Sequence, residues 1–144
     1  MAGQQFAFTP PRPSPSQPKR RFTLEQANRS LPLVKRVAAD IVKCHAAASQ
    51  AQSALDRAPA KEKAAAQKQL DAHVDRLQDL MEELSEVGCE IKDFRSGLLD
   101  FIARHQSRDV YLCWKLGEER IAFWHELGAG YTGRQPISKF HETQ

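Results

Sequence analysis

The chain has 144 residues, of which 41% are hydrophobic and 27% are charged. This length suits one domain with one modest core, and the ordinary composition excludes collagen, a wholly disordered chain and a disulfide-dense toxin. No stretch approaches the ~20 apolar residues of a membrane helix, and no basic segment followed by an apolar run opens the chain. We therefore expect a cytoplasmic protein without a membrane partner.

The net charge of +3 is unevenly distributed along the sequence. Residues 1–21 contain four basic side chains, no acidic one and five of the eight prolines, whereas residues 22–144 carry 17 basic and 18 acidic side chains. Proline blocks regular backbone hydrogen bonding, so we predict a disordered Pro-rich basic tail over residues 1–21. Because the domain itself is slightly acidic, the charge argues against nucleic acid as a partner.

Two amphipathic segments predict a helical hairpin. Thr23 and Gln26 have the spacing of a capping box, and Pro32 either kinks the helix that follows or lies in the first turn of a second helix. Apolar residues then recur at alternating steps of three and four on both sides of Pro59. The first stripe is Val34, Val37, Ile41, Cys44, Ala48, Ala51 and Leu55, and the second is Leu70, Val74, Leu77, Met81, Leu84, Gly88 and Ile91. A long antiparallel hairpin buries little surface by itself, so we expect a homodimer.

Aromatic residues concentrate after Ile91, and residues 98–102, 110–116 and 121–127 have strand character. We therefore predict an α+β fold in which the helical hairpin is followed by a small antiparallel sheet of two or three strands. The single domain is expected over residues 22–137, with a C-terminal tail over residues 138–144. If Leu116 pairs with Ile121, Leu112 faces His125, which places His125 on the apolar face that covers the helices.

A histidine on an apolar face needs a hydrogen-bond partner for each ring nitrogen. The acidic residues nearest to His125 in this arrangement are Glu90, Asp93 and Asp100. Two interpretations stay open: a structural hydrogen bond to a carboxylate, or a metal-binding or catalytic histidine that uses a carboxylate as second ligand or orienting group.

Other motifs favour ordinary structural roles. Three cysteines without a C-x-x-C pair indicate reduced thiols rather than a disulfide framework. His45 and His73 can approach across the hairpin, as two packed histidines or as a two-histidine metal site. Gly128 to Gly133 match G-x-G-x-x-G, but only 11 residues follow, too few for a dinucleotide-binding unit. This segment is expected to be a tight exit loop, with anion binding beside Arg134 as the alternative.

The order of these motifs resembles the bacterial domain-of-unknown-function family 2203 over about residues 22–137. The resemblance is carried by residues 22–28, 31–33, 91–93, 97–101, 110–114, 117–118, 124–126 and 133–136, which include Leu98-Leu99-Asp100-Phe101, Tyr111-Leu112-Cys113-Trp114 and Trp124-His125-Glu126. The family usually has proline where Ile102 stands. The resemblance implies a small bacterial cytosolic protein and transfers no activity.

Together these features favour a module that binds a small ligand or a metal ion, in a polar pocket centred on His125 between the second helix and the sheet. The alternative is a metal-assisted hydrolase that uses His125 with Asp93 or Asp100, so whether the protein is an enzyme stays open. The candidate metal ligands are His125, Asp93 and Asp100, with a divalent transition metal as the cofactor. The candidate ligand-binding residues are Lys92, Asp93, Asp100, Tyr111, Trp124, Glu126 and Arg134.

Overall fold

Helix α1 (Leu24–Arg57) is a single helix of 34 residues in a computed structural model that describes residues 20–143. The capping box is confirmed: the Gln26 N–H donates to Thr23 Oγ1 at 3.0 Å, and the Thr23 N–H donates to Gln26 Oε1 at 3.0 Å. Pro32 lies inside this helix and does not begin a second one. Nearly all of the expected basic tail lies outside the described residues; Arg21 at its end forms an ion pair with Asp109 at 2.9 Å.

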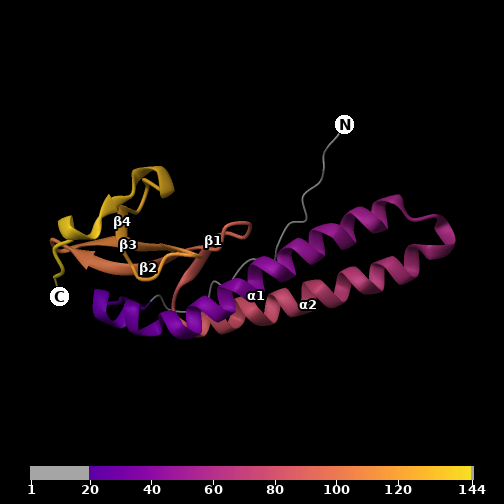
Figure 1. Ribbon diagram of the computed structural model, residues 1–144, viewed down its shortest axis with the longest axis horizontal. Coiled ribbons are helices and arrows are strands. Elements are labelled where there is room, and N and C mark those ends of the chain that lie inside the picture. The colour runs from indigo at the N-terminus through magenta and orange to yellow at the C-terminus, as the bar shows by residue number, and fades with distance from the viewer. Residues whose placement is uncertain (1–19, 144) are drawn as a thin grey trace.

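The helical hairpin is confirmed. A short 3-10 turn over Ala60–Glu62 connects α1 to helix α2 (Lys63–Val87), which runs back along α1. Both helices lie beside one face of the sheet at one end, and the hairpin extends beyond the sheet at the other (Figure 1). Helix α2 ends at Val87 and is capped by Gly88, whose left-handed φ of 110° suits glycine. The second apolar stripe therefore stops there, and Ile91 belongs to a strand. None of the helices in the described residues is long and apolar enough to cross a membrane.

The α+β class is confirmed, but the antiparallel sheet has five strands instead of two or three. The strands, in both chain and spatial order, are β1 (Glu90–Asp93), β2 (Leu98–His105), β3 (Arg108–Lys115), β4 (Phe123–Glu126) and β5 (Gln135–Pro136). The unpredicted strands are short, with four residues in β1 and two in β5. The prediction missed β1 because it continued the second helical stripe to Ile91, and β5 is too brief to show an alternating pattern.

The predicted register between β3 and β4 is wrong by one residue. Leu112 pairs with Trp124, and His125 pairs with Tyr111. The predicted pairing of Leu116 with Ile121 does not form, because the Ile121 N–H donates to Asn28 Oδ1 of α1 at 2.8 Å and the ladder begins at Phe123. A one-residue shift turns every side chain of the strand to the other face. His125 therefore lies on the sheet face away from the helices.

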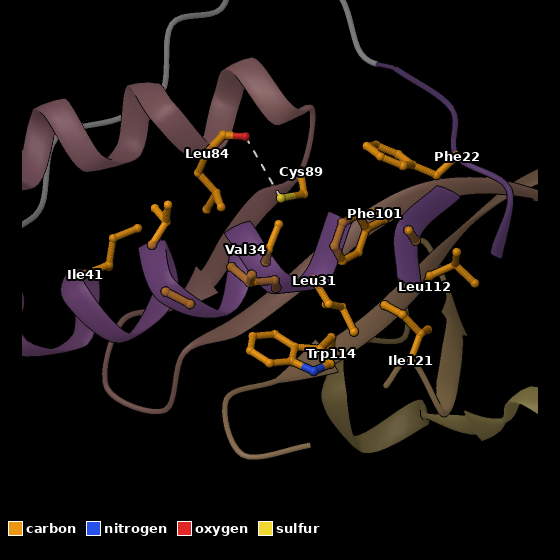
Figure 2. Packing of buried hydrophobic residues seen from close by; sticks show 14 of the residues in the cluster. Phe22, Leu31, Val34, Ile41, Leu84, Cys89, Phe101, Leu112, Trp114 and Ile121 are labelled. Carbon is orange, nitrogen blue, oxygen red and sulfur yellow. Dashed lines mark hydrogen bonds between the residues drawn. The ribbon is translucent and has the colours of Figure 1, made fainter. Parts of the chain in front are cut away.

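The core lies between the helices and the inner face of the sheet. Side chains from this face that are buried are Leu99, Phe101, Ala103, Val110, Leu112, Trp114 and Trp124. They belong to one cluster with Leu31, Val34 and Ile41 of α1 and with Leu84 of α2. Figure 2 shows Phe101, Leu112 and Trp114 beside the α1 side chains.

Residues 138–143, expected as a C-terminal tail, make contacts with the domain. The Glu142 carboxylate accepts a hydrogen bond from the Leu24 N–H at 2.6 Å, at the start of α1. The Thr143 hydroxyl accepts one from the Ser107 N–H at 2.8 Å, and the partly buried Phe140 packs against the core. This segment thus connects the beginning of α1 to the turn between β2 and β3.

Candidate metal centre

Three different metal-donor side chains meet on the outer face of the sheet. They come from three adjacent strands: Asp100 from β2, Cys113 from β3 and His125 from β4. Their donor atoms all lie within 4.8 Å of one another, the only such group of three or more His, Cys, Asp or Glu residues among residues 20–143. The relative exposures of Asp100, Cys113 and His125 are 4%, 0% and 2%, so this trio is closed to bulk solvent.

The backbone of β4 determines which ring nitrogen of His125 carries a proton. Nδ1 lies 2.7 Å from the carbonyl oxygen of Glu126. A carbonyl can only accept a hydrogen bond, so Nδ1 must be the donor. In a neutral ring, Nε2 is then an acceptor, although it lies 3.1 and 3.2 Å from the two carboxylate oxygens of Asp100. Two acceptors at this separation need a cation between them, which is either a proton or a metal ion.

Burial governs the protonation of the other two members. It raises the pKa of Asp100, while the neighbouring His125 opposes this shift. Burial, together with the charge of Asp100, raises the pKa of the Cys113 thiol to about 12. At neutral pH the thiol therefore keeps its proton unless a metal ion replaces it.

The chemistry of the donor set narrows the choice of metal ion. One thiolate, one imidazole and one carboxylate form a mixed set that Zn²⁺ and similar transition metals accept, whereas Mg²⁺ and Ca²⁺ prefer oxygen ligands alone. The Nδ1–H of His125 donates to a backbone carbonyl, an arrangement that orients metal-binding histidines in proteins. The three residues fit a divalent transition metal of the zinc class.

Two of the predicted ligand-binding residues lie beside the trio. The ring of Tyr111 is 5.5 Å from the ring of His125, between centroids. The ammonium group of Lys92 lies over Tyr111, 4.8 Å from its centroid, and its charge acts on Asp100. The structure does not bring Asp93 into the group, because its exposed carboxylate accepts hydrogen bonds from the backbone N–H and hydroxyl of Ser96.

The remaining predicted residues have other partners. Trp124 points to the inner face, with its ring 4.3 Å from that of His105. Glu126 forms an ion pair with Arg108.

Arg134 follows the glycine-rich segment and is engaged by the protein itself. It forms an ion pair with Glu118 at 2.8 Å, stacks on Phe123 at 4.0 Å and donates to the Cys113 carbonyl at 3.4 Å. These contacts favour the structural interpretation of the segment over anion binding.

Cys113 was not among the candidate ligands predicted from the sequence. The erroneous register placed Cys113 and His125 on opposite faces, although both belong to the motifs that carried the family resemblance.

The two histidines of the hairpin, His45 and His73, each have another contact. His45 stacks on Phe94, with 5.2 Å between the ring centroids, and the backbone carbonyl of His73 accepts a hydrogen bond from the Cys44 thiol at 3.2 Å.

The fold and the site define a small α+β protein with a buried cluster of three metal-donor side chains. The chain belongs to the family of uncharacterised conserved proteins designated DUF2203, whose sequence profile matches residues 20–137. This confirms the family indicated by the sequence motifs. No curated protein and no solved structure matches the chain.

Proposed function

We propose that this protein binds one divalent transition metal ion of the zinc class through Asp100, Cys113 and His125. The observation that carries the proposal is the buried contact between Nε2 of His125 and the carboxylate of Asp100, at 3.1 Å. In a neutral ring both atoms are acceptors, because Nδ1 carries the proton that is donated to the Glu126 carbonyl, and Cys113 adds a soft donor within the same 4.8 Å group. A metal ion would satisfy all three donors at once.

A proton shared by His125 and Asp100 is the competing explanation of this contact. It accounts for the His125–Asp100 contact, and in this explanation the protonated Cys113 thiol donates a hydrogen bond to the Asp100 carboxylate. The two explanations differ in an observable way, because metal binding requires the thiol and proton sharing does not.

Burial of the trio supports a binding site over the hydrolase alternative. Metal-assisted hydrolysis needs a coordination position that water and substrate can reach. All three side chains of this site are at most 4% exposed, and Asp93, the other carboxylate of the hydrolase hypothesis, lies apart. The three residues lie on the outer face of the sheet, not between α2 and the sheet as the sequence predicted.

Metal content is the direct test. Protein purified without an affinity tag should contain about one zinc-class ion per chain by native mass spectrometry and elemental analysis. Cys113→Ala should lose the ion, whereas Cys44→Ala, which removes a buried thiol from α1, should keep it. Circular dichroism should show that both variants are folded. A wild-type protein with only trace metal that takes up no added Zn²⁺ would contradict the proposal.

A cytosolic location and a homodimer complete the proposal. The location is supported by the three cysteines, which form no disulfide and are all buried as free thiols. The dimer is supported by the far half of the helical hairpin, which extends beyond the sheet in Figure 1.

A further inference from the structure

A fourth donor side chain lies in register beside the trio. Glu90 of the edge strand β1 pairs directly with Asp100, and Asp100 pairs directly with Cys113. Residues paired in this way point to the same face of a sheet, with Cβ atoms ~4.5–5.5 Å apart. The irregularity of β1 lies beyond Ile91, so Glu90 belongs to the regular part of the ladder. Glu90, Asp100 and Cys113 thus form one row on the outer face.

One carboxylate oxygen of Glu90 lacks a hydrogen-bond partner. Oε1 is buried and accepts no hydrogen bond, although the ammonium group of Lys92 lies 3.8 Å away. Buried polar oxygens in folded proteins nearly always have a partner, so an exception calls for an explanation. A metal cation on the same face, reached by rotation of the Glu90 side chain, would supply one.

We infer that Glu90 is the fourth protein ligand of the metal, an inference that rests on the proposed function. The Glu90 side chain is 34% exposed on an edge strand, unlike the other three, so it has room to rotate. Rotation is required, because its carboxylate lies outside the group of donor atoms within 4.8 Å of one another. Four protein ligands are typical of closed, structural zinc sites, whereas catalytic sites keep a position open for water.

The charges of the neighbourhood fit four ligands. Glu90, Asp100 and the thiolate of Cys113 together carry one negative charge more than a divalent ion neutralises. The ammonium group of Lys92, which already pairs with Glu90, offsets that charge. The metal would thereby connect four adjacent strands, from the edge strand β1 to β4.

The test uses Co²⁺ as a spectroscopic probe in the full-length protein. Wild-type protein should give the absorption of four-coordinate Co²⁺ with a thiolate ligand, and added azide should not change it because no position is open. Glu90→Ala should bind Co²⁺ at least ~10-fold more weakly and should respond to azide. Glu90→Gln, which keeps the shape of the side chain, should also weaken binding. Glu82→Gln, at an exposed position of α2, is the matched control.

The possible outcomes separate the inference from the proposed function. If Glu90→Ala and Glu90→Gln keep wild-type affinity while Cys113→Ala loses Co²⁺, the fourth ligand is refuted and the three-residue site stands. A wild-type spectrum that already changes with azide refutes the closed site as well. If wild-type protein binds neither Co²⁺ nor Zn²⁺, both proposals fail together.

Discussion

His125 and Asp100 meet across an intervening strand. His125 is on β4 and Asp100 is on β2, yet Nε2 of the histidine lies 3.1 Å from Oδ1 of the aspartate. Strand β3 separates them in the sheet and presents Cys113 on the same face, so the thiol joins the same group of donor atoms. The trio therefore depends on the register of two strand pairs at once.

This contact predicts strong energetic coupling in metal-free protein. His125→Ala removes the imidazole beside the buried Asp100 carboxylate, which then keeps only the Cys113 thiol as a hydrogen-bond partner, and should lower the free energy of unfolding by about 3–5 kcal/mol. The loss of unfolding free energy in the double variant Asp100→Asn/His125→Ala should be smaller than the sum of the losses in the two single variants, because no uncompensated carboxylate remains. Urea denaturation with a chelator present measures all four proteins. Additive effects would contradict the coupling.

Metal affinity should increase with pH. Burial and the charge of Asp100 raise the pKa of the Cys113 thiol to about 12, so metal binding near neutrality must displace the thiol proton. Each displaced proton makes the apparent affinity about tenfold tighter per pH unit. Competition between the protein and a chromophoric chelator for Zn²⁺, measured at about pH 6.5, 7.5 and 8.5, checks this pH dependence. An affinity that does not change with pH would show that the thiol is not a ligand.

Stability should fall in mild acid because of His105. This buried residue lies against Trp124, and its Nδ1 accepts a hydrogen bond from the His141 N–H at 2.8 Å. Burial and the charges of Arg108 and His141 lower the pKa of His105, while Glu126 opposes the shift. A lowered folded-state pKa means that the unfolded chain binds the proton more tightly. The stabilisation is therefore complete above the unfolded-state value of about 6.5 and is lost as the pH falls through the folded-state pKa.

Denaturation in urea as a function of pH tests the role of His105. His105→Gln should flatten the decrease below about pH 6.5. The exposed His141→Gln should retain most of the decrease, since that residue supplies its backbone N–H to the bond. An unchanged pH profile in His105→Gln would assign the acid sensitivity to other groups.

Asn28 should hold the loop that places β4 in register. Its side-chain oxygen accepts the N–H of Ile121, a residue only 1% exposed. Asn28→Ala leaves that buried donor unsatisfied and should lower the free energy of unfolding by about 1–3 kcal/mol. Arg29→Ala, which removes an exposed ion pair with Glu25, should change it by less than about 1 kcal/mol. Thermal or urea unfolding compares the two variants.

The expected homodimer stays a prediction that sedimentation velocity can test. At micromolar concentration the full chain should sediment as a dimer, with the far half of the hairpin as the contact. A chain that sediments as a monomer would contradict it.

Removing residues 1–19 should leave the oligomeric state and metal content unchanged, whereas removal through Phe22 should destabilise the domain. Phe22 is 4% exposed and packs edge-to-face on Phe101 at 5.1 Å.

Sequence reasoning succeeded where the signal is local. The capping box at Thr23, the helical stripes on either side of Pro59 and the existence of β2, β3 and β4 all depend on residues close together in the chain. A carboxylate partner for His125 was also expected from the sequence, although that argument placed the histidine on the wrong face of the sheet. Asp100 was among the acids named for that role, and the structure places it there.

The amino-acid sequence by itself therefore determined the α+β class, the helical hairpin and the family. It also named His125 and Asp100 as candidate partners. Only the tertiary structure decided the face on which His125 lies and the inclusion of Cys113 in the same group. The reason is that strand register is sensitive to a shift of a single residue, which reverses every side chain. Here the loop that precedes β4 is held by a hydrogen bond between Ile121 and Asn28, which are 93 residues apart in the chain, and no local pattern encodes such a contact.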